Sequence, residues 1–262
     1  MIRAFHRWPG LLAIALVTAL ALSGAALSVF PAADHLTAPQ AEARLTVAQL
    51  SERIQAVYPT VEQIRRAPSG RITAYWFDND TPGAAVIDPA TGAGAGSADP
   101  NPVERWLTNF HRSLLLGDGG RLVMAAGALA MLVLSVTGAA LVARRAGGWR
   151  HWFAPLRGTV PGRLHVEIAR IAVIGLVLSS VTALWMVAVT FELLPENAAM
   201  PDFPVEVSGE TGAGLADMAL IGTTPVASLR ELSFPYPGDP TDVFTLKTDQ
   251  GTGYLDQGTG AL

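Results

Sequence analysis

Three long apolar runs constrain the fold of this 262-residue chain more than any other feature. They cover residues 11–30, 122–143 and 171–191, and none of them contains a charged side chain. Each run has about the 20 residues that a helix needs to cross a bilayer. Only 15% of the residues are charged, whereas about 25% is usual in soluble proteins. We therefore predict a membrane protein with three transmembrane helices.

The distribution of charge predicts which way the chain crosses the membrane. The loop between the second and third runs holds five arginines and no acid within residues 144–163. Arg3 and Arg7 precede the first run, whereas residues 192–262 are rich in acids. Because basic segments are retained in the cytoplasm, we expect the N-terminus and this loop inside and the two larger polar segments outside. The first residues also resemble a signal peptide, and its cleavage would exclude a role for His6.

The chain divides accordingly into six segments, and the two outer ones are long enough to form small α+β modules. Cysteine is absent, which excludes disulfides and thiolate metal sites. The predicted segments are transmembrane helix 1 at 1–30, the first outer module at 31–120, transmembrane helix 2 at 121–143, the basic loop at 144–164, transmembrane helix 3 at 165–193 and the second outer module at 194–262.

Hydrophobic periodicity and turn residues predict the elements of the two outer modules. In the first module we expect a helix over 41–58, strands over 61–66, 71–77 and 84–88, a flexible link over 92–102, and a helix that starts near Pro102. In the second module we expect a short helix over 225–232 and a hairpin with strands over 242–248 and 251–256.

A short internal repeat links the two outer modules. Residues 87–93 read Ile-Asp-Pro-Ala-Thr-Gly-Ala, and residues 255–261 read Leu-Asp-Gln-Gly-Thr-Gly-Ala. Both look like strand ends that enter a turn, in which Asp and Gly have structural roles. The second module is therefore interpreted as a diverged copy of the first. Because the chain stops directly after the second copy, we expect a truncated sequence.

A second similarity lies inside the apolar runs. Residues 23–27 read Ser-Gly-Ala-Ala-Leu in the first, and residues 137–141 read Thr-Gly-Ala-Ala-Leu in the second. Small residues allow another helix or a flat cofactor to approach the backbone closely. For either motif alone, ordinary helix packing is the favoured interpretation over a cofactor slot.

Several separate motifs resemble the PepSY-associated transmembrane proteins. They are Ile-Asp-Pro-Ala-Thr-Gly at 87–92, Phe-His-Arg-Ser-Leu-Leu-Leu-Gly at 110–117, Trp-Phe-Ala-Pro-Leu-Arg-Gly at 152–158, Arg-Leu-His-Val-Glu-Ile-Ala-Arg at 163–170, Glu-Leu-Ser-Phe-Pro-Tyr-Pro-Gly at 231–238 and Tyr-Leu-Asp-Gln-Gly-Thr-Gly at 254–260. The later motifs resemble the flavoreductase branch, which includes ferric-siderophore reductases. The resemblance implies a bundle of membrane helices, three of them in this chain, with two PepSY-like modules on the periplasmic side of the bacterial inner membrane.

The same resemblance implies haem chemistry. Such proteins are haem proteins, often of four helices, that pass electrons outward. In the flavoreductase branch, cytoplasmic flavodoxin-like and NADPH–flavin reductase domains follow a fourth helix. This sequence has no Gly-rich dinucleotide fingerprint between a strand and a helix. FAD or FMN and NADPH would then belong to missing domains or to a separate reductase partner.

The five histidines are the candidate haem ligands, since a b-type haem in a helix bundle takes two axial ligands from neighbouring helices. His6 and His165 each open a transmembrane helix at the inner face, so they are placed to share one haem. The resemblance implies His111 as a ligand of a second, outer haem. Arg112 beside it is a candidate partner of a haem propionate, as are Arg7 and Arg163 at the inner face. His35 and His151 are weaker candidates. His35 could substitute as a ligand of the outer haem, whereas His151, which lies between aromatic residues, fits an interfacial anchor better than a ligand.

These features predict a transmembrane electron-transfer component that binds two b-type haems. Electrons would pass from a cytoplasmic NADPH/flavin donor to a periplasmic acceptor such as a ferric siderophore. The alternative is a non-redox membrane-anchored binding or regulatory protein with interfacial histidines. A transporter is disfavoured, because no span core carries a charged side chain. We predict no catalytic side chain, since Asp88, Thr91, Asp256 and Thr259 fit structural turns.

Overall fold

A computed structural model describes residues 2–79, 81–155, 158–195, 201–204 and 206–261. The chain forms two compact units. One comprises residues 1–27 and 103–197, and the other comprises residues 28–102 and 198–262. Each unit is described by itself.

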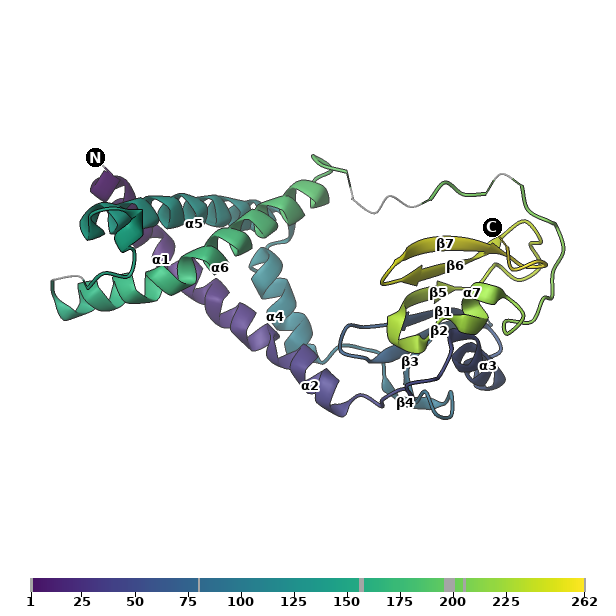
Figure 1. The fold of residues 1–262 in the computed structure, drawn as a ribbon. Coiled ribbons are helices and arrows are strands. Elements are labelled where there is room, and N and C mark those ends of the chain that lie inside the picture. Colours follow the sequence, from purple (N-terminus) through teal and green to yellow (C-terminus); the bar gives the residue numbers. More distant parts are fainter. Residues whose placement is uncertain (1, 80, 156–157, 196–200, 205, 262) are drawn as a thin grey trace. The chain divides into compact units, whose positions relative to one another are not determined.

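The first unit is a bundle of long helices. Its elements are α1 (Ile2–Leu27), α4 (Pro102–Ser113), α5 (Gly117–Ala146), the 3-10 turn η1 (Trp149–His151) and α6 (Val160–Thr190). Helix α5 packs against both α1 and α6 (Figure 1). Gly127, Ala128 and Ser135 are among its buried residues, and such small residues allow close packing of helices in a membrane.

The apolar surfaces of these helices fit a lipid environment. Three segments are long and apolar enough to cross a membrane: Ala13–Thr37, Gly117–Ala146 and Val160–Thr190. Ile171, Ile174 and Leu178 in α6 are more than 60% exposed, which suits contact with lipid chains rather than water. The prediction of three transmembrane segments is therefore confirmed at the level of helix length and composition. Helix α6 begins at Val160, five residues before the expected start at residue 165. Pro161 allows this earlier start, because proline suits the first turn of a helix.

The second unit contains one antiparallel sheet of seven strands. Its order is β4-β3-β2-β1-β5-β6-β7. The strands are β1 (Val61–Arg66), β2 (Ile72–Asp78), β3 (Thr81–Ile87), β4 (Gly94–Ser97), β5 (Leu229–Ser233), β6 (Val243–Thr248) and β7 (Gly251–Asp256). Residues 61–97 and 229–256 thus contribute to one continuous sheet, in contrast to the two separate modules expected from the sequence. They join where β1 pairs with β5, with Ile64 opposite Leu232.

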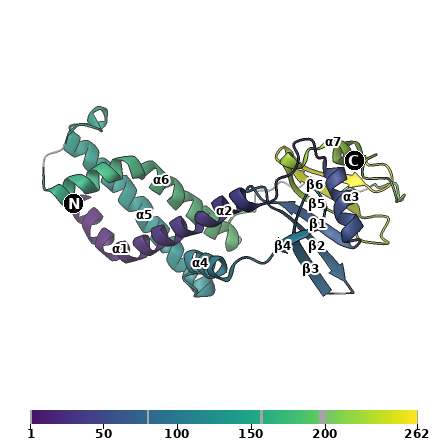
Figure 2. The same cartoon turned by 90° about the horizontal axis from the view of Figure 1, so that it is seen from below.

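Helices cover one face of this sheet. Helix α3 (Val47–Val57) packs against α7 (Ala219–Thr223), and Figure 2 shows both beside the sheet. A capping box between Thr46 and Gln49 starts α3, which explains why the helix begins later than the expected residue 41. The fully buried core includes Leu50 and Ile54 from α3, Ile221 from α7, and Ile64 and Leu232 from the central strands.

Two local expectations are wrong. The expected flexible link at 92–102 contains edge strand β4, which pairs with β3. The expected helix at 225–232 is a 3-10 turn, η2 (Val226–Ser228), followed by β5. Val226, Leu229 and Leu232 are all buried, and their spacing of three residues imitates a helix. In β5 the register shifts between Leu229 and Glu231, so a strand buries residues with this spacing.

The internal repeat has the same structure in both halves. The Asp88 N–H donates to the carbonyl of Ala93, and the Asp256 N–H donates to the carbonyl of Ala261. The carboxylates of both aspartates accept hydrogen bonds from their own turns. Asp256 also accepts from the N–H and hydroxyl of Ser208 at 2.8 and 2.7 Å. These hydrogen bonds, with the Ser208 hydroxyl foremost, hold the pKa of Asp256 well below its usual range.

Candidate functional site

Two histidines lie side by side in the helical unit. His6 comes from the first turns of α1, and His165 comes from the second turn of α6. Their ring centroids are 6.3 Å apart, and the ring planes differ by 64°. The structure thus brings together the two residues that the sequence placed at the inner face. Their ligation of haem stays a prediction.

Helix α5 supports the His6 ring through two adjacent residues. The Thr137 Oγ1 lies 3.1 Å from Nδ1 of His6, within hydrogen-bonding distance. A Cβ atom built on Gly138 would lie 2.9 Å from Cε1 of His6. No side chain larger than hydrogen fits at residue 138 without moving the ring. The imidazole is therefore fixed both by a polar contact and by close approach to a helix backbone.

His6 and His165 line a cavity of about 1070 Å³. This volume lies just above the roughly 300–1,000 Å³ that is usual for small-molecule and cofactor sites. Most of the lining is apolar and comes from α1, α5 and α6. The buried Oγ of Ser135 also lines it and has no hydrogen-bond partner among the residues that the structure describes. The cavity also has four arginines in its wall: Arg3, Arg7, Arg144 and Arg145.

A second histidine, His111, contacts the other end of α1 in a similar way. We call such a pair of a hydroxyl residue and a glycine that contacts a histidine ring a histidine seat. His111, near the end of α4, has its Nδ1 2.9 Å from the Oγ of Ser23. A Cβ atom built on Gly24 would lie 3.2 Å from Cε1 of His111. Leu114 and Leu115 follow with positive φ angles of 52° and 61°, and this turn connects α4 to α5. Arg112, the candidate propionate partner, is exposed next to His111.

His35 and His151 occupy different settings. His151 is exposed in η1, beside the stacked rings of Trp149 and Trp152. His35 belongs to α2 (Val29–Thr37) in the other unit. Its Nδ1 donates to the carbonyl of Ser69 at 3.1 Å.

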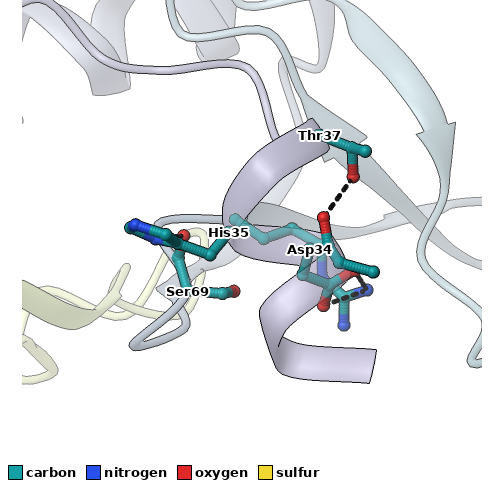
Figure 3. A network of polar contacts seen from close by, with 6 residues as sticks. Asp34, His35, Thr37 and Ser69 are labelled. Carbon is teal, nitrogen blue, oxygen red and sulfur yellow. Dashed lines mark hydrogen bonds and ion pairs between the residues drawn. The ribbon is translucent and has the colours of Figure 1, made fainter. Parts of the chain in front are cut away.

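The His35 contact belongs to a small polar network shown in Figure 3. Next to His35, Asp34 forms an ion pair of 3.1 Å with Arg71. Both contacts tie α2 to the turn between β1 and β2. This supports a structural role for His35.

The comparison with known proteins fits this arrangement of membrane helices and sheet. A family model described as the PepSY-associated TM region matches residues 3–247. The chain belongs to this family. No curated protein and no solved structure matches it. Membership in this family supports a PepSY-associated membrane protein but does not define its activity, which depends on the residues of the site.

The sequence pointed to the histidines of this PepSY-associated protein but missed what holds them. Ser23, Gly24, Thr137 and Gly138 were interpreted as helix-packing residues, and each Ser/Thr–Gly pair in fact contacts a histidine. The available signal was the similarity of the two motifs.

The buried Arg170 was also missed as a structural element. It joins Glu167 at 2.8 Å and the carbonyl of Ala154 at 2.8 Å. It therefore holds the loop after α5 against α6.

Proposed function

We propose that this PepSY-associated chain is the haem-binding, electron-transferring membrane component of an inner-membrane reductase. Electrons would enter from a cytoplasmic NADPH/flavin donor and leave to a periplasmic acceptor such as a ferric siderophore. The observation that carries the proposal is the His6–His165 pair in a large cavity between three helices. When bound, haem supplies one-electron redox chemistry. The protein supplies its ligands, their orientation and a water-poor environment.

The separation of the two rings leaves room for a metal between them. The centroids of His6 and His165 are 6.3 Å apart, and the ring planes differ by 64°. Imidazole nitrogens bind metals at about 2.0–2.1 Å, so the two side chains would hold a haem iron between them. Two imidazoles suffice for haem. Among the described residues, no group of three or more His, Cys, Asp or Glu side chains is suited to a bare metal ion.

The cavity also suits an amphiphilic macrocycle. Its apolar side chains match a porphyrin ring, and the guanidinium groups of Arg3, Arg7, Arg144 and Arg145 match carboxylate substituents such as propionates. Retention of basic residues in the cytoplasm explains the same arginines equally well. For that reason the paired imidazoles carry the proposal, and the arginines only support it.

The position of His111 supports a second haem site near the opposite membrane face. Ser23, its partner, lies 17 residues after His6 in the continuous helix α1. At 1.5 Å per residue, this is about 26 Å along the helix axis. One haem cannot reach both positions, and two would provide an electron path across most of the hydrocarbon layer. Arg112 is placed to pair with a propionate there.

The test is the visible absorption spectrum of the full chain in detergent, oxidised and then dithionite-reduced. We expect sharp α and Soret bands in the wild-type protein and their loss or halving in His6→Ala and His165→Ala. His151→Ala is the matched control, because its side chain is exposed in η1, and it should keep the wild-type spectrum. A colourless protein from haem-replete cells would refute the proposal and favour a non-redox, membrane-anchored binding or regulatory protein.

A further inference from the structure

The two histidine seats have the same construction. In each, a hydroxyl in a transmembrane helix contacts Nδ1 of a histidine from another helix, at 3.1 Å for Thr137–His6 and 2.9 Å for Ser23–His111. The next residue is a glycine against Cε1 of that ring. The same hydroxyl–glycine order at two separate sites indicates that both pairs have the same role towards their histidine, in addition to helix packing.

The backbone hydrogen bonds of the two hydroxyls favour one tautomer of each histidine. A hydroxyl has one hydrogen to donate and can also accept. Thr137 donates its hydrogen to the carbonyl of Val133 at 2.7 Å, and Ser23 donates to the carbonyl of Leu20 at 3.1 Å. A hydroxyl that donates to its own backbone carbonyl can only accept from the histidine, and Nδ1 is then the N–H donor. In a neutral imidazole, the lone pair is then on Nε2.

We propose that Thr137 and Ser23 are positioning residues that hold His6 and His111 in the Nδ1–H tautomer, with Nε2 ready to bind haem iron. A hydrogen bond from the non-ligating nitrogen fixes the tautomer and orientation of a metal-bound histidine and increases its basicity. The ligand class is a metal-centred macrocycle, so the inference rests on the proposed function. It adds that the chain prepares both histidines for the metal before haem arrives.

The seats are also reciprocal. Helix α1 contributes His6 to the seat on α5 and provides Ser23–Gly24 as the seat for His111. The α4–α5 segment contributes His111 and provides Thr137–Gly138. Helix α1 and the α4–α5 segment therefore each supply one histidine and one hydroxyl–glycine pair. This exchange explains why the similar motifs at 23–27 and 137–141 both lie towards the C-terminal ends of their helices.

The first test observes the tautomers without haem. The full chain would be labelled with ¹⁵N-histidine, produced in haem-deficient cells and studied by NMR in detergent, with signals assigned from His6→Ala and His111→Ala. We expect the Nδ1–H form for both residues in the wild-type protein. Thr137→Val, which keeps the shape but removes the hydroxyl, should mix the tautomers of His6 alone. Ser23→Ala should do so for His111 alone, and Thr137→Ser and Ser23→Thr should retain the wild-type pattern.

The second test measures haem in the same variants. We expect Thr137→Val and Ser23→Ala each to lose about 10- to 100-fold in haem affinity at one site, as for other outer-shell partners of metal ligands. The midpoint potential of the affected haem should rise, because the ligand becomes less basic. Thr137→Ser separates this effect from misfolding, because it keeps the hydroxyl.

The two proposals fail in different ways. In one outcome, the histidine tautomers depend on Thr137 and Ser23, but the protein takes up no haem. That result would support the positioning role of the two hydroxyls and refute the haem function. In the other outcome, the protein binds haem, and Thr137→Val and Ser23→Ala change neither the tautomers nor the haem affinity and potential. That result would refute the positioning role and leave the haem function supported.

Discussion

Replacing Gly138 by alanine should weaken haem binding without weakening the helix bundle. The new Cβ would lie 2.9 Å from Cε1 of His6. Ordinary van der Waals contact begins near 3.4 Å, so the ring has to retreat by about 0.5 Å. Alanine is the better helix former by up to about 1 kcal/mol. The change therefore acts in opposite directions on the ligand and on the helix.

The structure also grades the expected effect. In catalysis a misplacement of about 1 Å can cost on the order of 100-fold in rate. On the same scale, we expect about 0.5 Å at His6 to cost about tenfold in haem affinity. At Gly24 the built Cβ is 3.2 Å from Cε1 of His111, only about 0.2 Å short of ordinary contact, and we expect about twofold or less. At Gly175 in α6 the built Cβ has no atom within 4 Å among the described residues. Gly175→Ala is therefore the matched control.

The assay compares haem release with protein stability in the three variants. Haem release is followed from the Soret band during transfer to an excess of a competing apoprotein, and stability is followed by thermal unfolding of the haem-free chains in detergent. We expect release in the order Gly138→Ala, Gly24→Ala, Gly175→Ala, fastest first, with unfolding temperatures equal to or above the wild-type value. Equal haem retention in Gly138→Ala and Gly175→Ala would refute the close approach of His6 to this glycine. A lower unfolding temperature in Gly138→Ala would show a packing role instead.

Two further predictions concern the sheet unit. Leu232→Ala removes a fully buried side chain opposite Ile64 and should cost about 2–5 kcal/mol; hydrogen exchange in the full chain should rise together in 61–87 and 229–256, and separate behaviour of these segments would contradict a shared sheet. Asp256→Asn removes the charge that accepts from Ser208 and should cost about 2 kcal/mol at neutral pH. Because folding lowers the pKa of Asp256, its contribution is complete above the unfolded pKa of about 4 and is lost as pH falls further. Acid titration of sheet unfolding should therefore be flatter below about pH 4 in Asp256→Asn, and an unchanged acid limb would rule out this role.

The sequence was sufficient for features set by local pattern. Uncharged runs of about 20 residues have few alternatives to membrane helices. The hairpins β1–β2 and β6–β7 were also predictable, because strands close in sequence are joined by recognisable turns. The pairing of β1 with β5 joins residues such as Ile64 and Leu232. No local signal encodes contact between strands that are separated by two membrane crossings.

For the site, the positions of the histidines along the helices could be predicted from the sequence, whereas the residues that hydrogen-bond to them could not. His6 and His165 could be paired because both precede apolar runs on the basic side. Ser23 and Thr137 could not be assigned, because a hydroxyl in a membrane helix usually donates to its own backbone, as both do here. Their role depends on accepting a second hydrogen bond from another helix. That contact appears only after α1, α4 and α5 have packed.

The reciprocal seats also give the bundle a register. His6 near the start of α1 meets Thr137 near the end of α5, and Ser23 near the end of α1 meets His111 just before α5 begins. Helices α1 and α5 are therefore antiparallel, with one of these two polar contacts towards each end of α1. A slide of one helical turn, about 5.4 Å, would break both hydrogen bonds together and move both rings off their glycines. Apolar side chains alone tolerate such a slide, because lipid and protein are similarly apolar. The same residues that orient the two candidate ligands thus set the distance between them, and that distance is what a path for electrons across the membrane requires to be constant.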